Sequence, residues 1–368
     1  MPMTPHQRFL AFARHQPVDR PPLLEAGVWE ATVRRWSAES GRGRGEVLAW
    51  QAECDAQADT GIDFSMQPPW PERVVAEDAQ TVTRTDRMGL TYREFQDNPE
   101  RSMPQFLGFP VQTRQDWEAV KRRFAPALAE RYPVDWPARR AGWRGQGPIL
   151  RLYGYVANYY GGPSLFGFVR MLLGPERALY AFYDDPALVE DMMETSTEFS
   201  CAVLARALRE APVTYVQFWE DMAYKTGSLI SPAMVRKFML PRYRRIVESI
   251  RAAGVDQIIL DSDGDVSELI PIWLEAGING VQPLEQAAGN DLQAYRRRYG
   301  RDLLLLGGLD KRALARGPEA IDQELEQKLP LAREGGYLPM VDHGVPPDVS
   351  WDNWQYYWRR KKELLGLG

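Results

Sequence analysis

The sequence predicts an α/β protein, a (β/α)8 TIM barrel whose N-terminal region is elaborated by a β-hairpin. Along the 368 residues, short apolar runs rich in β-forming side chains alternate with longer segments of helical periodicity. This is the pattern of repeated βα units on a parallel sheet. Hydrophobic residues make up 44% of the chain, enough for a large core. No linker or low-complexity tract interrupts the alternation, so we expect residues 1–368 to form a single barrel domain.

Eight strands and several helices follow from the periodicity. The predicted strands are 21–25, 60–64, 148–153, 213–220, 256–261, 279–283, 302–308 and 336–343. Helices are predicted at 5–15 with Thr4 as cap, at 176–196, at 231–254 ending on Gly254, and at 267–277 ending on Gly277. Residues 73–96 alternate as a β-hairpin does, which predicts an insertion at about 70–100.

Composition excludes several classes of partner. The formal charge is −5 and no basic stripe is present, so we expect no nucleic-acid partner. Only Cys54 and Cys201 occur, which excludes a disulfide framework and indicates a reducing compartment. The N-terminal segment lacks the apolar core of a signal peptide, and no stretch is long enough to span a bilayer. We therefore expect a cytoplasmic protein with no membrane partner.

Polar side chains follow nearly every predicted strand. In a (β/α)8 barrel the active site lies at the C-terminal ends of the strands. The residues at these positions are Glu25, Asp63, Tyr153, Tyr155, Glu220, Asp221, Asp261, Asp263, Glu285, Asp310, Asp342 and His343. Loops are polar in any case, so each residue either lines a pocket or only begins a loop. The collective pattern favours a pocket.

Five ordered motifs carry a family resemblance. They are T-G-S-L-I-S-P (226–232), D-S-D-G-D (261–265), E-A-G-I-N-G-V-Q-P-L-E (275–285), G-G-L-D-K (307–311) and G-G-Y-L-P-M-V-D-H-G-V-P-P-D-V-S-W-D-N (335–353). The chain resembles the uroporphyrinogen decarboxylase superfamily, and is closer to its corrinoid-linked methyltransferases than to the decarboxylase of haem synthesis. The resemblance implies a (β/α)8 barrel with its pocket at the C-terminal mouth. It also implies a homodimer with facing mouths.

Two departures from the family motifs narrow the chemistry. Haem-pathway decarboxylases carry the arginine-rich M-R-Q-A-G-R-Y where this chain has L-L-E-A-G-V-W (23–29). We expect Glu25 to repel a porphyrinogen with eight carboxylates, which argues against that substrate. Zinc-dependent methyltransferases carry His-x-Cys-Gly where this chain has Asp261-Ser262-Asp263-Gly264, so the thiolate ligands are missing.

An oxygen-rich metal site is one interpretation of these positions. Asp261 and Asp263 are two residues apart and would share one face of a continuing strand, with Gly264 turning the backbone behind them. With Glu220 and His343 they would bind one divalent ion, and Zn, Fe, Mn or Co suits such a set. Alternatively, Asp261 accepts hydrogen bonds from backbone amides in the turn. We expect Asp265 to cap the helix that begins near Ser267.

The remaining candidates are assigned to catalysis or substrate binding. His343 matches the histidine of the family's N-L-G-H-G motif, and we expect it to be catalytic together with Asp261 and Glu220. Asp310 matches the aspartate of G-N-L-D-P, and either lines the pocket or caps the next helix. The substrate-binding candidates are Glu25, Asp63, Tyr153, Tyr155, Asn158, Asp221, Lys225, Glu285 and Asp310.

The leading functional interpretation is a methyltransferase. It would move a methyl group from a small methoxy or methylated substrate to a corrinoid or a tetrahydrofolate pterin, which a partner corrinoid protein would present. A metal or an acid such as His343 would neutralise the leaving heteroatom. The alternatives are a decarboxylase of a small or tetrapyrrole-like acid, in which Asp or His protonates a carbanion, and a non-catalytic barrel that binds a ligand or carrier.

Overall fold

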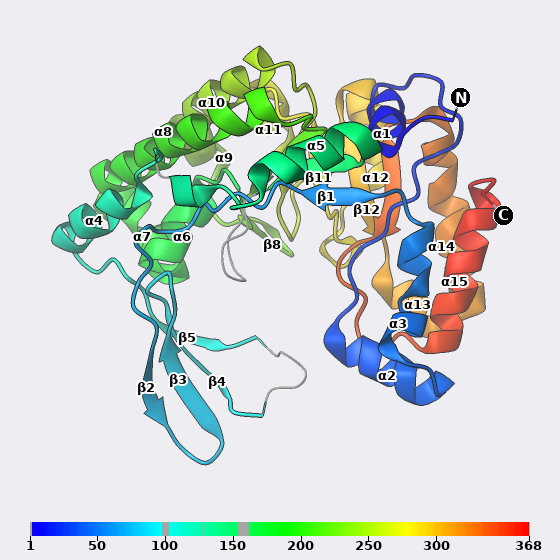
Figure 1. Cartoon of the computed structure of the whole chain (residues 1–368), viewed down its shortest axis with the longest axis horizontal. Coiled ribbons are helices and arrows are strands. Elements are labelled where there is room, and N and C mark those ends of the chain that lie inside the picture. The colour runs from blue at the N-terminus through cyan, green and yellow to red at the C-terminus, as the bar shows by residue number, and fades with distance from the viewer. Residues whose placement is uncertain (1, 98–102, 128, 154–161, 368) are drawn as a thin grey trace.

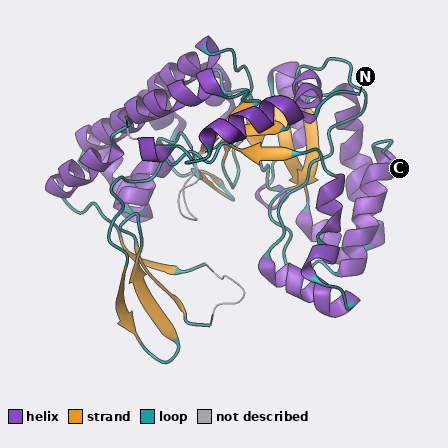
Figure 2. Cartoon of the chain, in the orientation of Figure 1, coloured by secondary structure: helices purple, strands orange, loops and turns teal. Residues whose placement is uncertain are grey.

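A curled parallel sheet with helices packed around it forms the centre of the molecule (Figures 1 and 2). The computed structural model describes residues 2–97, 103–127, 129–153 and 162–367. In that part of the chain the sheet has seven strands in the order β1-β6-β7-β10-β11-β12-β13, and every neighbouring pair is parallel. Their bounds are β1 Gln57–Asp59, β6 Ile149–Leu152, β7 Tyr215–Trp219, β10 Ile258–Asp261, β11 Gly280–Gln282, β12 Leu304–Leu309 and β13 Tyr337–Val341. The predicted α/β barrel class is confirmed.

The two predicted strands nearest the N-terminus differ from the structure. β1 lies at Gln57–Asp59 and not at 60–64, because Gly61 adopts a left-handed φ of 72° that takes the chain out of the sheet. Residues 21–25 form no regular strand. Their segment instead bridges the two edges of the sheet. The carbonyl of Leu23 accepts from Asp55 N, just before β1, and Val28 forms a parallel bridge with Val345, just after β13. An irregular eighth segment thus completes the ring.

Helices cover the outer surface of the sheet. The predicted helix at 176–196 is two helices, because Pro186 begins a new one after Asp185, whose side chain caps it. The predicted helix at 231–254 contains a π-helical turn at Val235–Met239. The α-helices are α1 Pro5–Ala13, α2 Glu30–Ser40, α3 Arg44–Val47, α4 Arg114–Lys121, α5 Trp136–Gln146, α6 Phe166–Leu173, α7 Pro175–Asp184, α8 Pro186–Glu210, α9 Pro232–Met234, α10 Leu240–Ala252, α11 Ile270–Ala276, α12 Leu292–Tyr299, α13 Lys311–Arg316, α14 Pro318–Lys328 and α15 Trp351–Leu364. Short 3-10 turns lie at Ala49–Glu53, Arg122–Phe124, Ala129–Arg131, Gln286–Ala288, Gly300–Asp302 and Leu329–Glu334.

An antiparallel sheet projects from the body of the molecule (Figure 1). Its order is β2-β3-β4-β5, with bounds Arg73–Glu77, Thr81–Thr85, Thr91–Phe95 and Gln105–Gly108. The segment predicted as a hairpin, residues 73–96, contains three strands, β2, β3 and β4, and β5 extends them into a sheet of four. A small hairpin, β8 Ala223–Tyr224 and β9 Gly227–Ser228, follows β7. In the described part of the chain, no helix is both long and apolar enough to cross a bilayer.

Candidate functional site

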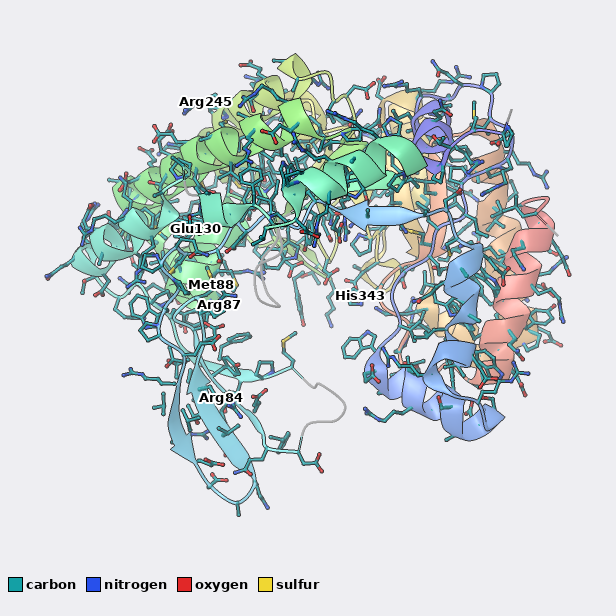
Figure 3. The ribbon with its side chains drawn as sticks, viewed as in Figure 1. Arg84, Arg87, Met88, Glu130, Arg245 and His343 are labelled. Atoms are coloured by element: carbon teal, nitrogen blue, oxygen red, sulfur yellow. The ribbon has the colours of Figure 1, made fainter. Side chains whose placement is uncertain are left out.

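The C-terminal ends of the parallel strands surround a cavity of about 900 Å³. Its lining includes several of the predicted residues at strand ends: Glu25, Tyr153, Asp221, Asp261, Asp263 and His343. Figure 3 places His343 near the middle of the view, between the projecting sheet that carries Arg84 and the helices opposite it, and Arg245 on the outer helical layer. Six residues that were predicted from strand ends, and that are far apart in the sequence, therefore line one cavity.

Asp261 ends β10 and borders the cavity with one oxygen fully engaged. Its Oδ2 accepts hydrogen bonds from Nε2 of Gln217 at 2.8 Å and Nε2 of Gln282 at 3.0 Å. Burial is the main reason why the pKa of Asp261 rises to about 7, and the negative charge of Asp221 adds to the effect. Near neutral pH a large fraction of Asp261 therefore carries a proton. Of the two alternatives for Asp261, a role in the pocket agrees with its position, and its partners are side chains rather than turn amides.

Asp263 is the most strongly perturbed acid at the cavity. Burial raises its pKa to about 8, and repulsion by Asp221, Glu285 and Asp261 contributes. Nε2 of His343 lies 3.8 Å from Oδ2 of Asp263, which is longer than a hydrogen bond. The pKa of His343 is lowered by burial and by the positive charge of Lys311. The raised pKa of Asp263 favours its protonated carboxyl, and the lowered pKa of His343 favours its neutral imidazole.

The D-S-D-G-D loop is held by the hairpin that follows β7. Gly264 has a φ of 85°, and a Cβ built there would lie 2.6 Å from the backbone carbonyl of Ala223. Asp265 N donates to the carbonyl of Tyr224 at 2.9 Å, and Met222 N donates to the hydroxyl of Ser262 at 3.1 Å. Only glycine permits this close approach of the loop to the hairpin.

The cap predicted for Asp265 is partly correct. Its Oδ1 accepts from Ser267 N at 3.0 Å, so the carboxylate binds backbone as expected. However, α11 begins only at Ile270, and its N-cap position is Leu269. Asp265 therefore stabilises the turn that leads into the helix and not the helix terminus itself.

Two arginines line the cavity, and both are paired with carboxylates. Arg151 on β6 makes a bidentate contact with Asp59, at 2.6 Å and 3.0 Å, and its guanidinium lies 4.6 Å from the ring centre of Tyr153. Arg170 on α6 donates to Asp221 at 3.1 Å. Neither arginine was among the predicted site residues, because Arg151 lies within a strand and Arg170 within a helix. The signal for Arg151 was a cation inside an otherwise apolar run.

Asp221 is held in an unusual backbone conformation. Its φ is 47°, in the left-handed region that a non-glycine residue rarely adopts. Its Oδ2 pairs with Arg170, while its Oδ1 faces Asp263 N at 3.4 Å. The predicted position of Asp221 at the pocket agrees with the structure, and its charge is one cause of the raised pKa values of Asp261 and Asp263.

Apolar side chains supply most of the remaining cavity wall. Several come from the projecting sheet and its flanks, and others from the barrel: Leu90, Met103, Phe106, Phe109, Met171 and Leu306. The antiparallel insertion is thus part of the cavity wall, which the sequence did not indicate.

Glu220 does not face the cavity, so its predicted catalytic and metal-binding roles are wrong. The side chain is fully buried in the barrel wall. Its carboxylate accepts from Leu165 N at 2.8 Å, Gly167 N at 2.9 Å, the hydroxyl of Ser164 at 3.1 Å and the hydroxyl of Tyr243 at 2.8 Å. Four donors saturate the carboxylate, so Glu220 anchors the start of α6 and has no capacity left for a ligand.

The carboxylate of Glu25 also has a structural role, although Glu25 is one of the residues that line the cavity. The side chain is 0% exposed and pairs with Lys361 at 2.8 Å, whose side chain is 1% exposed. Val341 N donates to it at 2.7 Å, and the hydroxyl of Tyr357 also bonds to it. The predicted repulsion of a carboxylate-rich substrate by Glu25 is therefore wrong, because Lys361 neutralises the charge inside the wall.

Other predicted substrate-binding residues lie outside the cavity lining. The carboxylate of Asp63 accepts from Ser65 N and from Nε2 of Gln67, since β1 ends five residues earlier than predicted. Lys225 lies in the exposed β8–β9 turn, with Nζ 5.9 Å from the ring centre of Tyr224.

Two further candidates support the site without lining it. Glu285 accepts from Gly264 N at 3.1 Å and from Nζ of Lys311 at 3.3 Å. Asp310 is the N-cap of α13, accepts from Arg312 N at 2.9 Å and pairs with the Arg312 guanidinium, which settles the two alternatives in favour of the cap. Tyr155 and Asn158 lie outside the described residues.

The predicted metal set is not assembled. Within the described ranges, no three His, Cys, Asp or Glu side chains are arranged to hold a metal ion. The physical reason is that Glu220 is turned into the wall and Asp261 Oδ2 is occupied by two amide donors. The residues present do not fit Zn, Fe, Mn or Co as a bound ion at this site.

Comparison with known proteins gives the family. A family model described as uroporphyrinogen decarboxylase (URO-D) matches residues 163–364, more than half of the chain. A uroporphyrinogen decarboxylase of Xanthomonas campestris pv. campestris (strain B100) is 26% identical over 380 positions, covering 95% of this chain and 96% of that protein. One from Nocardia farcinica (strain IFM 10152) is 31% identical over 218 positions, covering 56% of each.

A solved structure is also similar. A B12-independent methionine synthase from Shewanella sp. W3-18-1, in complex with selenomethionine, shares 13% identity over 64% of this chain and 68% of that one, with a TM-score of 0.40. The residues that the family model matches include Asp221, Asp261, Asp263 and His343. The chain belongs to the uroporphyrinogen decarboxylase family.

Proposed function

We propose that the chain is a methyltransferase of this family that accepts a small methoxy or otherwise methylated substrate and uses carboxylic acids in place of a metal. One observation carries the proposal. Two carboxyl groups that hold protons near neutral pH, Asp261 and Asp263, border a largely apolar cavity in which both lining arginines are already paired. Such a cavity suits a neutral ligand whose leaving oxygen needs a proton.

Asp263 is the proposed proton donor. As the bond between the methyl carbon and the ether oxygen breaks, the bonding electron pair stays on oxygen, and the Asp263 carboxyl supplies the proton that turns an alkoxide or phenolate into an alcohol or phenol. The methyl group passes to the acceptor's nucleophilic lone pair. His343, neutral and 3.8 Å from Asp263, is placed to return a proton from solvent afterwards.

A corrinoid or tetrahydrofolate, presented by a partner protein, supplies the nucleophilic acceptor when bound. The cavity volume of about 900 Å³ is near the upper end for small-molecule sites. This volume supports the proposal because it leaves room for a small substrate and for the reactive face of a second molecule. A homodimer with facing mouths stays a prediction.

Decarboxylation of a small acid is the second candidate, and the names of the curated relatives favour it. The same protonated acids would protonate the carbanion that remains after loss of CO₂. A substrate carboxylate, however, needs a cation to hold it, and Arg151 and Arg170 already pair with Asp59 and Asp221. We therefore rank this reaction second.

The test compares both reactions in one set of samples. The purified chain is incubated with aromatic and aliphatic compounds carrying a ¹³C-methoxy group, with cob(I)alamin or tetrahydrofolate as acceptor, and methyl transfer is followed by ¹³C NMR. Parallel samples with small carboxylic acids and with uroporphyrinogen are assayed for CO₂. We expect methyl transfer, and a loss on the order of 100-fold in Asp263→Asn.

The matched control is Asp256→Asn. Asp256 lies just before β10, away from the cavity, and pairs with Arg14 at the surface. It should leave the rate unchanged. CO₂ release without methyl transfer would replace the proposal by the second candidate, and neither reaction across the panel would favour a non-catalytic binding barrel.

A further inference from the structure

A row of hydrogen-bonded side chains crosses five neighbouring strands beside the cavity. Its members are Asp59 on β1, Arg151 on β6, Gln217 on β7, Asp261 on β10 and Gln282 on β11. Asp59 accepts from Arg151, Arg151 donates to Oε1 of Gln217 at 3.1 Å, and both glutamines donate to Asp261. Each strand contributes one member, so the row forms only when these five strands lie side by side in the sheet.

The chemistry of Arg151 sets the direction of every hydrogen bond as far as Asp261. A guanidinium only donates, and the bidentate contact with Asp59 fixes its plane. Gln217 must therefore turn its oxygen toward Arg151 and its NH₂ group toward Asp261. Gln217 is 1% exposed, so no water competes for this orientation.

Two N–H donors thus meet on one oxygen of Asp261. A proton on Oδ2 would face the NH₂ groups of Gln217 and Gln282 and would cost both hydrogen bonds. Oδ1 has no hydrogen-bond partner among the described residues, and the half-buried Asp261 borders the cavity. The proton of the neutral acid therefore belongs on Oδ1.

We propose that Gln217 and Gln282 are positioning residues that hold the Asp261 proton on Oδ1, and that the site thereby recognises a neutral oxygen acceptor, such as a carbonyl, ether or phenol oxygen. Oδ1–H donates to this oxygen. The pKa of Asp261, raised to about 7 by burial and by Asp221, agrees with a protonated donor. This inference rests on the proposed function, because it takes Asp261 to be an acid of the reaction site. Its test measures binding and titration and does not require the enzyme to catalyse a reaction.

The first experiment measures recognition of a carbonyl. The probes are acetophenone and α-methylstyrene, which share a shape but differ in C=O against C=CH₂. We expect the wild-type chain at pH 6 to bind acetophenone about fivefold more tightly, the effect of one hydrogen bond. The infrared carbonyl band of bound acetophenone should move to lower frequency. Asp261→Asn keeps an oxygen that accepts from the two glutamines and an NH₂ group that can donate toward the cavity, so it should retain the preference for acetophenone. Asp261→Leu should lose this preference.

The second experiment tests the glutamines. The ¹³C signal of the Asp261 carboxyl is titrated without ligand in the wild type, Gln217→Leu and Gln282→Leu. Donors to Oδ2 favour the ionised form, so removing either should raise the pKa of Asp261. Released from the row, the proton should also leave Oδ1 part of the time, and the carbonyl shift of acetophenone should weaken. Gln293→Leu is the control, because Gln293 is half-buried on α12, donates to the carbonyl of Gln327 and does not line the cavity.

Two results would overturn the inference. One is an Asp261 signal that titrates at the ordinary value of an aspartate in the wild type. The other is a titration and carbonyl band that are the same in Gln217→Leu, Gln282→Leu and Gln293→Leu. A clear carbonyl shift in a chain that transfers no methyl group would reject the proposed function and leave this inference standing.

Discussion

Replacing Asp261 by Asn should stabilise the protein, and increasingly so as pH rises. In the unfolded chain an aspartate loses its proton near pH 4, whereas in the folded chain Asp261 keeps it until about pH 7. Between these values the folded state binds more protons, so this group makes the free energy of unfolding fall as pH rises through that window and stay level above it. Asn has no proton to lose, so the variant escapes this loss.

The expected size follows from the shift. About three pKa units correspond to roughly 4 kcal/mol at pH 7 and above. Asp261 is only half-buried beside an open cavity, so we reduce this to about 2 kcal/mol for solvent screening. The Asn side chain also preserves the hydrogen bonds, because its oxygen accepts from Gln217 and Gln282.

Urea unfolding of both proteins at pH 4.5, 6, 7 and 8 measures the effect. The difference should be smallest at pH 4.5, below half of its full value because the unfolded aspartate is already mostly ionised there, and should reach its full value by pH 8. Asp256→Asn, which removes a surface ion pair with Arg14, should show a small difference that does not change over this range. If Asp261→Asn is destabilising at pH 8, or its effect is independent of pH, Asp261 is not a protonated buried acid.

Three further outcomes are expected. Lys361→Met should lower the free energy of unfolding, measured with urea, by about 3–5 kcal/mol, because it leaves the buried Glu25 carboxylate without its cation. Adding Glu25→Gln to this variant should recover most of the loss. Gly264→Ala should lower the free energy of unfolding by about 1–3 kcal/mol, because Gly264 has a φ of 85° and a Cβ there would lie 2.6 Å from backbone. The β8–β9 hairpin should also be cleaved faster by proteases. Unchanged stability would contradict the close approach. Asp221→Asn should lower the pKa of Asp263 from about 8, seen as an earlier midpoint in a ¹³C titration, because it removes a repelling charge. An unmoved midpoint would show that the charge of Asp221 does not contribute to the raised pKa.

Several residues of the site could be predicted, because the sequence shows locally where each strand ends and in which direction it runs. Asp261, Asp263 and His343 follow apolar runs, and the parallel order of a barrel brings such positions together. The prediction was wrong for Glu220 and Glu25 because both also follow or end apolar segments, yet turn into the wall. The direction a carboxylate takes depends on which donors surround it, and these come from distant parts of the chain.

The sequence by itself determined the fold class, the approximate place of six strands and the family resemblance, since periodicity and motif spacing are written along the chain. Only the tertiary structure decided which acids are available for chemistry. Lys361 reaches Glu25 across 336 positions, and Gln217 and Gln282 reach Asp261 from two other strands. Burial and partners of this kind set protonation, and they exist only once the sheet has closed.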